Sequence, residues 1–97
     1  MIAVYAPRAL RDLEAIAEYL SERSPSGAAN VMDAIKSSID ALTAFPKIGP
    51  TIDDAGHRRL SVLRFPYVIF YRLAEDEILI LHIRHTSRRP INPEADL

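Results

Sequence analysis

Arginine and histidine side chains that could bind an anionic substrate gather near the end of the chain. The cluster comprises Arg84, His85, Arg88 and Arg89, with Arg72 on a preceding apolar run. Guanidinium groups bind phosphate or carboxylate through paired hydrogen bonds, and an imidazole transfers protons near neutral pH. Together these groups suit metal-free cleavage of RNA, in which arginine stabilises the phosphorane charge and histidine acts as acid or base.

A purely structural role is the alternative for the same cluster. Glu94 and Asp96 follow within a few residues, and either carboxylate could pair with an arginine of its own chain. The residue types alone leave both interpretations open, with local pairing slightly favoured.

The three histidines do not follow a metal-ligating pattern. His82 and His85 are three residues apart, a spacing that sends side chains on a strand to opposite faces. His57 stands by itself beside Asp53 and Asp54, in a segment that we expect to be a loop. We therefore expect neither a metal ion nor another cofactor.

The signatures of several other enzyme classes are missing. The sequence contains no G-x-S-x-G, no H-E-x-x-H and no cysteine, and its three glycines form no phosphate-binding loop. The arginine and histidine cluster is thus the one constellation in the chain that could carry chemistry.

Length and composition predict one domain spanning residues 1–97. No apolar run approaches the roughly 18 residues of a membrane span, no cationic leader is present, and cysteine is absent, so we expect a cytoplasmic protein without membrane association. The net charge of −1 argues against a protein that coats nucleic acid indiscriminately. Residues 1–54 carry five basic and eight acidic side chains, whereas residues 55–93 carry seven basic and three acidic ones. Any surface for an anionic partner therefore belongs to the second half.

Hydrophobic periodicity predicts two helices and four strands. Apolar residues at helical spacing fill the stretches from Pro7 to Arg23 and from Pro25 to Phe45, with Ser24 as the expected cap between them. The expected strands are Ile2–Tyr5, Arg59–Leu63, Tyr67–Leu73 and Ile78–His85. The order β-α-α-β-β-β predicts an α+β fold with two layers, in which a helical hairpin covers one face of a mostly antiparallel sheet.

The last strand is aliphatic on both faces at its start, which predicts a position inside the sheet. By alternation, Leu79, Leu81 and Ile83 are expected to face the helical hairpin. On the exposed side of the first helix, Arg8 and Asp12 are spaced to form an ion pair. The hairpin residues expected in the core are Leu10, Leu13, Ile16, Leu20, Ile35, Ile39 and Leu42.

With these elements in order, the chain resembles toxins of the RelE/ParE superfamily from bacterial type II toxin–antitoxin modules, over nearly its whole length. The resemblance rests on the joint order and spacing of four stretches. They are A-L-R-D-L-E-A-I-A-E-Y-L (Ala9 to Leu20), F-P-x-x-G (Phe45 to Gly49), R-x-L-x-V-L-R-F-P-Y-V-I-F-Y-R (Arg58 to Arg72) and D-x-I-x-I-L-x-I-x-H-x-x-R-x-P (Asp76 to Pro90).

Two activities compete within that superfamily. The RelE-like branch cleaves mRNA on the ribosome and usually has an arginine directly after the tyrosine of its middle strand, but here Val68 follows Tyr67. A late catalytic tyrosine of part of that branch has no counterpart after Arg89, although Arg89 itself matches a RelE-like catalytic arginine. The chain therefore resembles the ParE branch more, whose characterised members poison DNA gyrase.

The resemblance to the ParE branch also implies roles for the cluster and a partner. Arg72, Arg84, His85, Arg88 and Arg89 would contact the target, whereas a RelE-like ribonuclease would use His85 and Arg89 as its catalytic residues. The expected partner is a ParD-type antitoxin, bound to the basic sheet half and to grooves beside the helical hairpin. A binding module that has lost toxicity is the third possibility.

Overall fold

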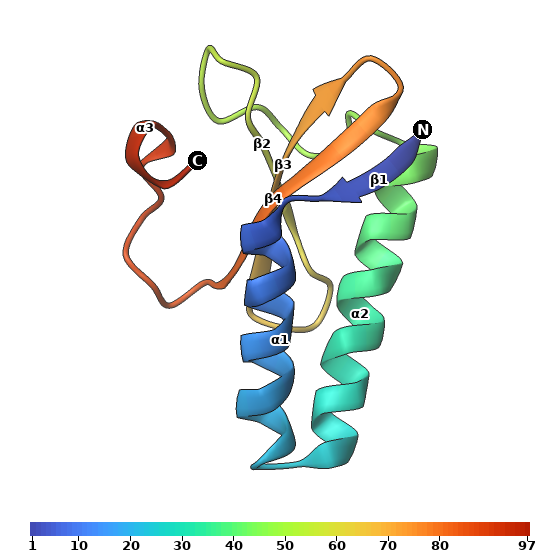
Figure 1. The fold of residues 1–97 in the computed structure, drawn as a ribbon, viewed down its shortest axis with the longest axis vertical. Coiled ribbons are helices and arrows are strands. Elements are labelled where there is room, and N and C mark those ends of the chain that lie inside the picture. Colours follow the sequence, from blue (N-terminus) through green and yellow to red (C-terminus); the bar gives the residue numbers. More distant parts are fainter.

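A four-stranded sheet and two long helices make up most of the computed structural model, which describes residues 1–97 (Figure 1). The strand order is β1-β4-β3-β2, with β1 parallel to β4 and the other pairs antiparallel. The predicted α+β fold with the order β-α-α-β-β-β is confirmed, and a one-turn helix in the tail adds to it. The elements are β1 (Ile2–Tyr5), α1 (Pro7–Ser21), α2 (Pro25–Ala44), β2 (Arg58–Ser61), β3 (Tyr67–Ala74), β4 (Glu77–His85) and α3 (Pro93–Asp96).

The two long helices form the predicted antiparallel hairpin, and local sequence signals set their ends. Pro7 and Pro25 occupy first-turn positions, where the missing N–H would have no partner. Ser24 caps α2, since its Oγ accepts a hydrogen bond from the N–H of Gly27 at 3.1 Å. The helix ends before Phe45, which precedes Pro46 and leaves helical geometry. None of the helices combines the length and apolar character that a membrane crossing requires.

The core lies between this hairpin and one face of the sheet, but the phase of β4 differs from the prediction. Ile78, Ile80 and Ile83 are fully buried in the core, whereas Leu79 and Leu81 are only partly buried and lie outside it. Leu10, expected in the core, is 47% exposed.

A β-bulge explains the changed phase of β4. Tyr71 pairs with Ile80 and Phe70 with His82, so that Leu81 has no partner on β3. One extra residue in a strand reverses which positions face the core from there on. Ile80 and Ile83 therefore face the helices together although they are three residues apart. The prediction that Leu79 and Leu81 face the hairpin is wrong. The same prediction for Ile83 is right, but only because of the bulge.

The loop after α2 is fixed to the sheet through Tyr71. Its buried hydroxyl donates to the carbonyl of Pro46 at 2.9 Å and accepts from the N–H of Gly49 at 3.0 Å. A Cβ atom at Gly49 would lie 2.3 Å from the carbonyl oxygen of Arg59, so only glycine fits there. This contact gives the F-P-x-x-G stretch a structural role.

Candidate anion-binding site at the C-terminal arginines

Arg84 lies at the centre of the candidate site. The residue is 7% exposed, and its cross-strand neighbour is the buried Val68. One guanidinium nitrogen donates to the main-chain carbonyl of Arg89 at 2.9 Å. Burial lowers the pKa of Arg84, and the positive charges of Arg89 and Arg88 lower it further. The cationic form of Arg84 is therefore held in an unfavourable environment that a bound anion would improve.

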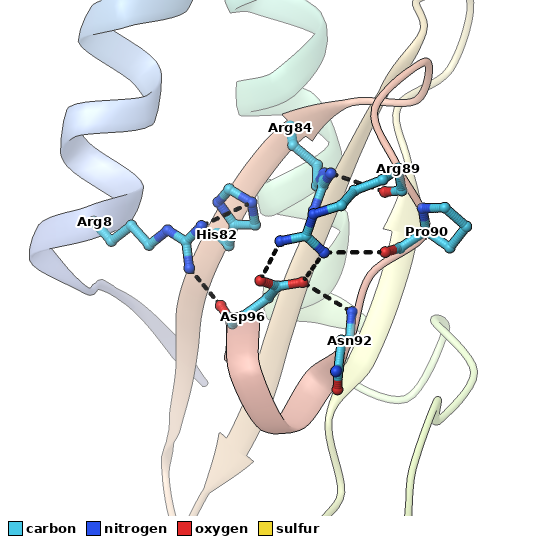
Figure 2. A network of polar contacts seen from close by, with 7 residues as sticks. All are labelled: Arg8, His82, Arg84, Arg89, Pro90, Asn92 and Asp96. Carbon is cyan, nitrogen blue, oxygen red and sulfur yellow. Dashed lines mark hydrogen bonds and ion pairs between the residues drawn. The ribbon is translucent and has the colours of Figure 1, made fainter.

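Arg89 forms a bidentate ion pair with Asp96 of α3 (Figure 2). Both N–H···O distances are 2.7 Å, and one carboxylate oxygen also accepts from the N–H of Asn92 at 2.9 Å. The hydrogen bonds from Arg89, together with that from Asn92, hold the pKa of Asp96 well below its usual range. The alternative of local pairing thus describes Arg89 and Asp96 correctly, while Glu94 is exposed.

Arg8 and Asp12 do not form the predicted ion pair with each other, because both turn to the buried His82. Nδ1 of His82 lies 2.7 Å from Oδ2 of Asp12, and Nε2 lies 3.4 Å from a guanidinium nitrogen of Arg8. Since arginine only donates, Nε2 accepts and Nδ1 carries the proton. The other terminal nitrogen of Arg8 donates to the main-chain carbonyl of Asp96. A continuous chain of polar contacts therefore joins α1, β4 and α3 (Figure 2).

The edge of β4 explains why Asp12 lies there. Strand β1 ends at Tyr5, opposite Ile80, and leaves the N–H of Ile83 without a strand partner. Oδ2 of Asp12 accepts from this N–H at 2.9 Å, so one carboxylate serves both a buried imidazole and a free strand edge.

Replacing Asp12 with alanine should lower the free energy of unfolding by about 1–3 kcal/mol, because it leaves the buried donors of His82 and Ile83 unpaired. Glu14→Ala is the matched control, since Glu14 is an exposed carboxylate of the same helix. Urea unfolding followed by circular dichroism measures both variants. Equal midpoints for the two would contradict the role assigned to Asp12.

His85 follows Arg84 on β4 and points to the other face of the sheet, although both residues line the same hollows. His85 pairs with the core residue Tyr67, with ring centroids 5.3 Å apart, and its Nδ1 accepts from the N–H of Ser87 at 3.0 Å. His82 pairs with Phe70 and so lies on the opposite face, as the strand spacing predicted.

Arg72 is exposed on β3, on the same face of the sheet as Arg84. Arg72 lies four residues along β3 from Val68, the cross-strand partner of Arg84. At the usual rise of about 3.3 Å per residue, the distance from Arg72 to Val68 along the strand is ~13 Å. Of the predicted target-contact residues, the structure thus brings Arg84, His85, Arg88 and Arg89 around a common hollow and leaves Arg72 apart.

Two large hollows and one small one adjoin these residues. A wholly arginine-lined hollow of about 400 Å³ is bounded by Arg8, Arg84, Arg88 and Arg89. A larger groove of about 670 Å³ runs between α1 and the ends of β3 and β4, with Tyr19 and Leu20 on its apolar wall. His85, Arg84 and Arg88 line this groove as well.

Sequence reasoning missed Arg8, Asp12 and His82 as members of this site. The signal in the sequence is His82, because a polar residue buried within an aliphatic strand needs a polar partner. The parallel pairing of β1 with β4, which the structure shows, brings the first two turns of α1 beside the end of β4 and so supplies that partner.

A family model described as the ParE toxin of the type II toxin–antitoxin system parDE matches residues 3–90. The chain belongs to this family. The match ends before α3, so Asp96 lies outside the matched region, whereas its partners Arg8 and Arg89 lie inside it.

Individual relatives agree with the family assignment. Toxin RelE2 of Caulobacter vibrioides is 38% identical over 85 residues, covering 88% of this chain and 94% of the relative. A putative toxin, Y4kP, of Sinorhizobium fredii is 34% identical, covering 84% of each chain. Among solved structures, the chromosomal ParDE TA system from P. aeruginosa matches with a TM-score of 0.76 and 25% identity, covering 89% of this chain and 95% of the other. The recognised resemblance to the RelE/ParE superfamily is confirmed.

Proposed function

We propose that this member of the ParE toxin family inhibits DNA gyrase, and that a ParD-type antitoxin neutralises it. The observation that carries the first part is the state of the two residues that an RNA-cutting relative would use. Val68, in place of an arginine, is a buried apolar side chain beside Arg84, and Arg89 is already bound to Asp96. Val68 cannot hold the phosphate of an mRNA, and Asp96 occupies the fork of Arg89 in the free protein, whereas Arg84 and Arg88 line open hollows where a macromolecular target can contact them.

Ribosome-dependent mRNA cleavage is the second candidate, and one observation favours it. His85, Arg84, Arg88 and Arg89 all line a small hollow of about 90 Å³ on the sheet. An imidazole beside several guanidinium groups is the equipment expected for acid–base cleavage of RNA. Two of the curated relatives also bear the name RelE.

The two candidates are separated by assays on the purified protein. It should inhibit supercoiling by gyrase or trap cleaved DNA, and should leave ribosome-bound mRNA intact. Arg88→Ala should weaken gyrase inhibition about tenfold, or ~1.4 kcal/mol, since it removes an exposed charge of the proposed contact surface.

Arg11→Ala is the control for Arg88→Ala, because it removes an exposed arginine of α1 that forms no side-chain hydrogen bond. Codon-specific mRNA cleavage without any effect on gyrase would refute the proposed target, and His85 and Arg89 would then be the first residues to test in that reaction.

The groove between α1 and the sheet supports the antitoxin part of the proposal. Ile16, Tyr19, Leu20 and Phe65 give it an apolar floor, and Arg88 supplies a basic rim. Tyr19 is 55% exposed, and although the guanidinium of Arg23 stacks 3.6 Å from its ring centre, much of its aromatic surface remains open to solvent in the free protein. An acidic, amphipathic segment of an antitoxin would bury the apolar residues while its carboxylates meet the arginine.

A further inference from the structure

The arginine-lined hollow contains more positive charge than the protein neutralises. Arg8, Arg84, Arg88 and Arg89 surround it, and Asp96 is the one carboxylate that reaches them. Each guanidinium group carries five N–H donors. Arg84 uses one of its nitrogens, for the carbonyl of Arg89, and the Arg88 side chain forms no hydrogen bond. Four cations beside one anion leave unused donors aimed at a common space.

The contacts of Asp96 are those that an external anion would make. Its two carboxylate oxygens meet the fork of Arg89 side by side at 2.7 Å, the geometry by which arginine binds carboxylate and phosphate alike. Its main-chain carbonyl accepts from Arg8. One residue of α3 thus supplies three acceptor atoms to two of the four arginines (Figure 2).

The attachment of α3 depends on these contacts. Every hydrogen bond that links residues 92–97 to the rest of the chain is donated by Arg8 or Arg89. The helix is a single turn of four residues, and so short a helix is not stable alone in water. In Figure 1, α3 stands apart from α2, at the end of a segment that loops away from β4. A stronger anion can therefore displace α3 without disturbing the core.

We propose that Arg8, Arg84, Arg88 and Arg89 form a binding site for phosphate groups, and that Asp96 of the C-terminal helix occupies this site in the free protein as a displaceable internal ligand. A phosphate ligand matches this site better than the carboxylate of Asp96 does, because Asp96 leaves Arg84 and Arg88 without an anion. A polyphosphate or a nucleic-acid backbone brings further oxygens and negative charge to these two arginines. An internal competitor lowers the apparent affinity for the external ligand by the fraction of molecules in which the site is free.

This inference deepens the proposed contact of the arginines with a target, but its test requires neither gyrase nor antitoxin. Binding of inorganic pyrophosphate and of a short single-stranded DNA oligonucleotide is measured by calorimetry at low ionic strength. Asp96→Asn should bind at least one probe about tenfold more tightly than the unchanged protein. Glu94→Gln is the matched control, because it removes the same charge two residues away from an exposed side chain, and it should leave the affinity within about twofold.

Two further measurements test the site and its occupant. Arg88→Ala, combined with Asp96→Asn, should remove the gain in affinity, since Arg88 belongs to the site and not to the contacts of α3. In the unchanged protein, saturating probe should collapse the dispersed amide signals of residues 95–97 toward random-coil positions in NMR spectra.

Tighter binding of both probes would show that one isolated phosphate cluster suffices, and tighter binding of the oligonucleotide alone would assign the site to a nucleic-acid backbone. Equal affinities for Asp96→Asn and Glu94→Gln, or binding with α3 still in place, would overturn the proposal.

Discussion

Ile80→Ala should lower the free energy of unfolding by about 2–5 kcal/mol, a large part of the stability of a small domain. Ile80 is fully buried in the core, faces the helical hairpin and has Tyr71 as its cross-strand partner. The protein loses the transfer free energy of the missing methylene and methyl groups and gains a cavity between the sheet and the helices.

Leu81→Ala is the matched control, because it removes a similar volume from the next residue of the same strand. Leu81 is the bulged residue and is only partly buried, so its truncation should cost less than half as much. Chemical unfolding of both variants gives the comparison. A larger loss for Leu81→Ala would mean that the bulge is absent and that simple alternation describes β4.

The phase of β4 could not be predicted, although its place inside the sheet could. The residues from Ile78 to Leu81 are all aliphatic, so each of them could face either the helices or the other side of the sheet. The sequence therefore provides no polar position here that would fix the register. The bulge places Leu81 out of the ladder, and its position depends on how β3 and β4 twist together. The helix ends, by contrast, depend on local chemistry at Ser24, Pro25 and Pro46, and were predictable for that reason.

The candidate site was predictable only where its members are close in sequence. Arg84, Arg88 and Arg89 lie close together in the sequence, and the tail with Asp96 begins directly after them. Arg8 belongs to the opposite end of the chain, and the parallel pairing of β1 with β4 brings it next to these residues. No local pattern indicates that pairing, and Asp12, four residues on, offered a simpler partner for Arg8 that the fold does not use.

Antitoxin binding should stabilise the protein about as much as a fully buried core side chain does. A ligand that binds only the native state, present at about a thousand times its dissociation constant, raises the free energy of unfolding by ~4 kcal/mol. The melting temperature in the presence of the proposed ParD-type antitoxin should therefore rise well above that of the protein alone. Unchanged melting at high antitoxin concentration would favour an isolated binding module.

The site of antitoxin binding can be tested in the same experiment. Tyr19→Ala should remove much of the thermal shift, because Tyr19 presents its half-exposed ring to the groove between α1 and the sheet. Leu10→Ala removes a comparably exposed apolar side chain from the same helix outside the groove, and should leave the shift intact. Both residues contribute little to the core, so a difference between the variants reports on binding and not on folding. Equal loss of the shift in the two variants would place the antitoxin on the outer surface of α1 instead.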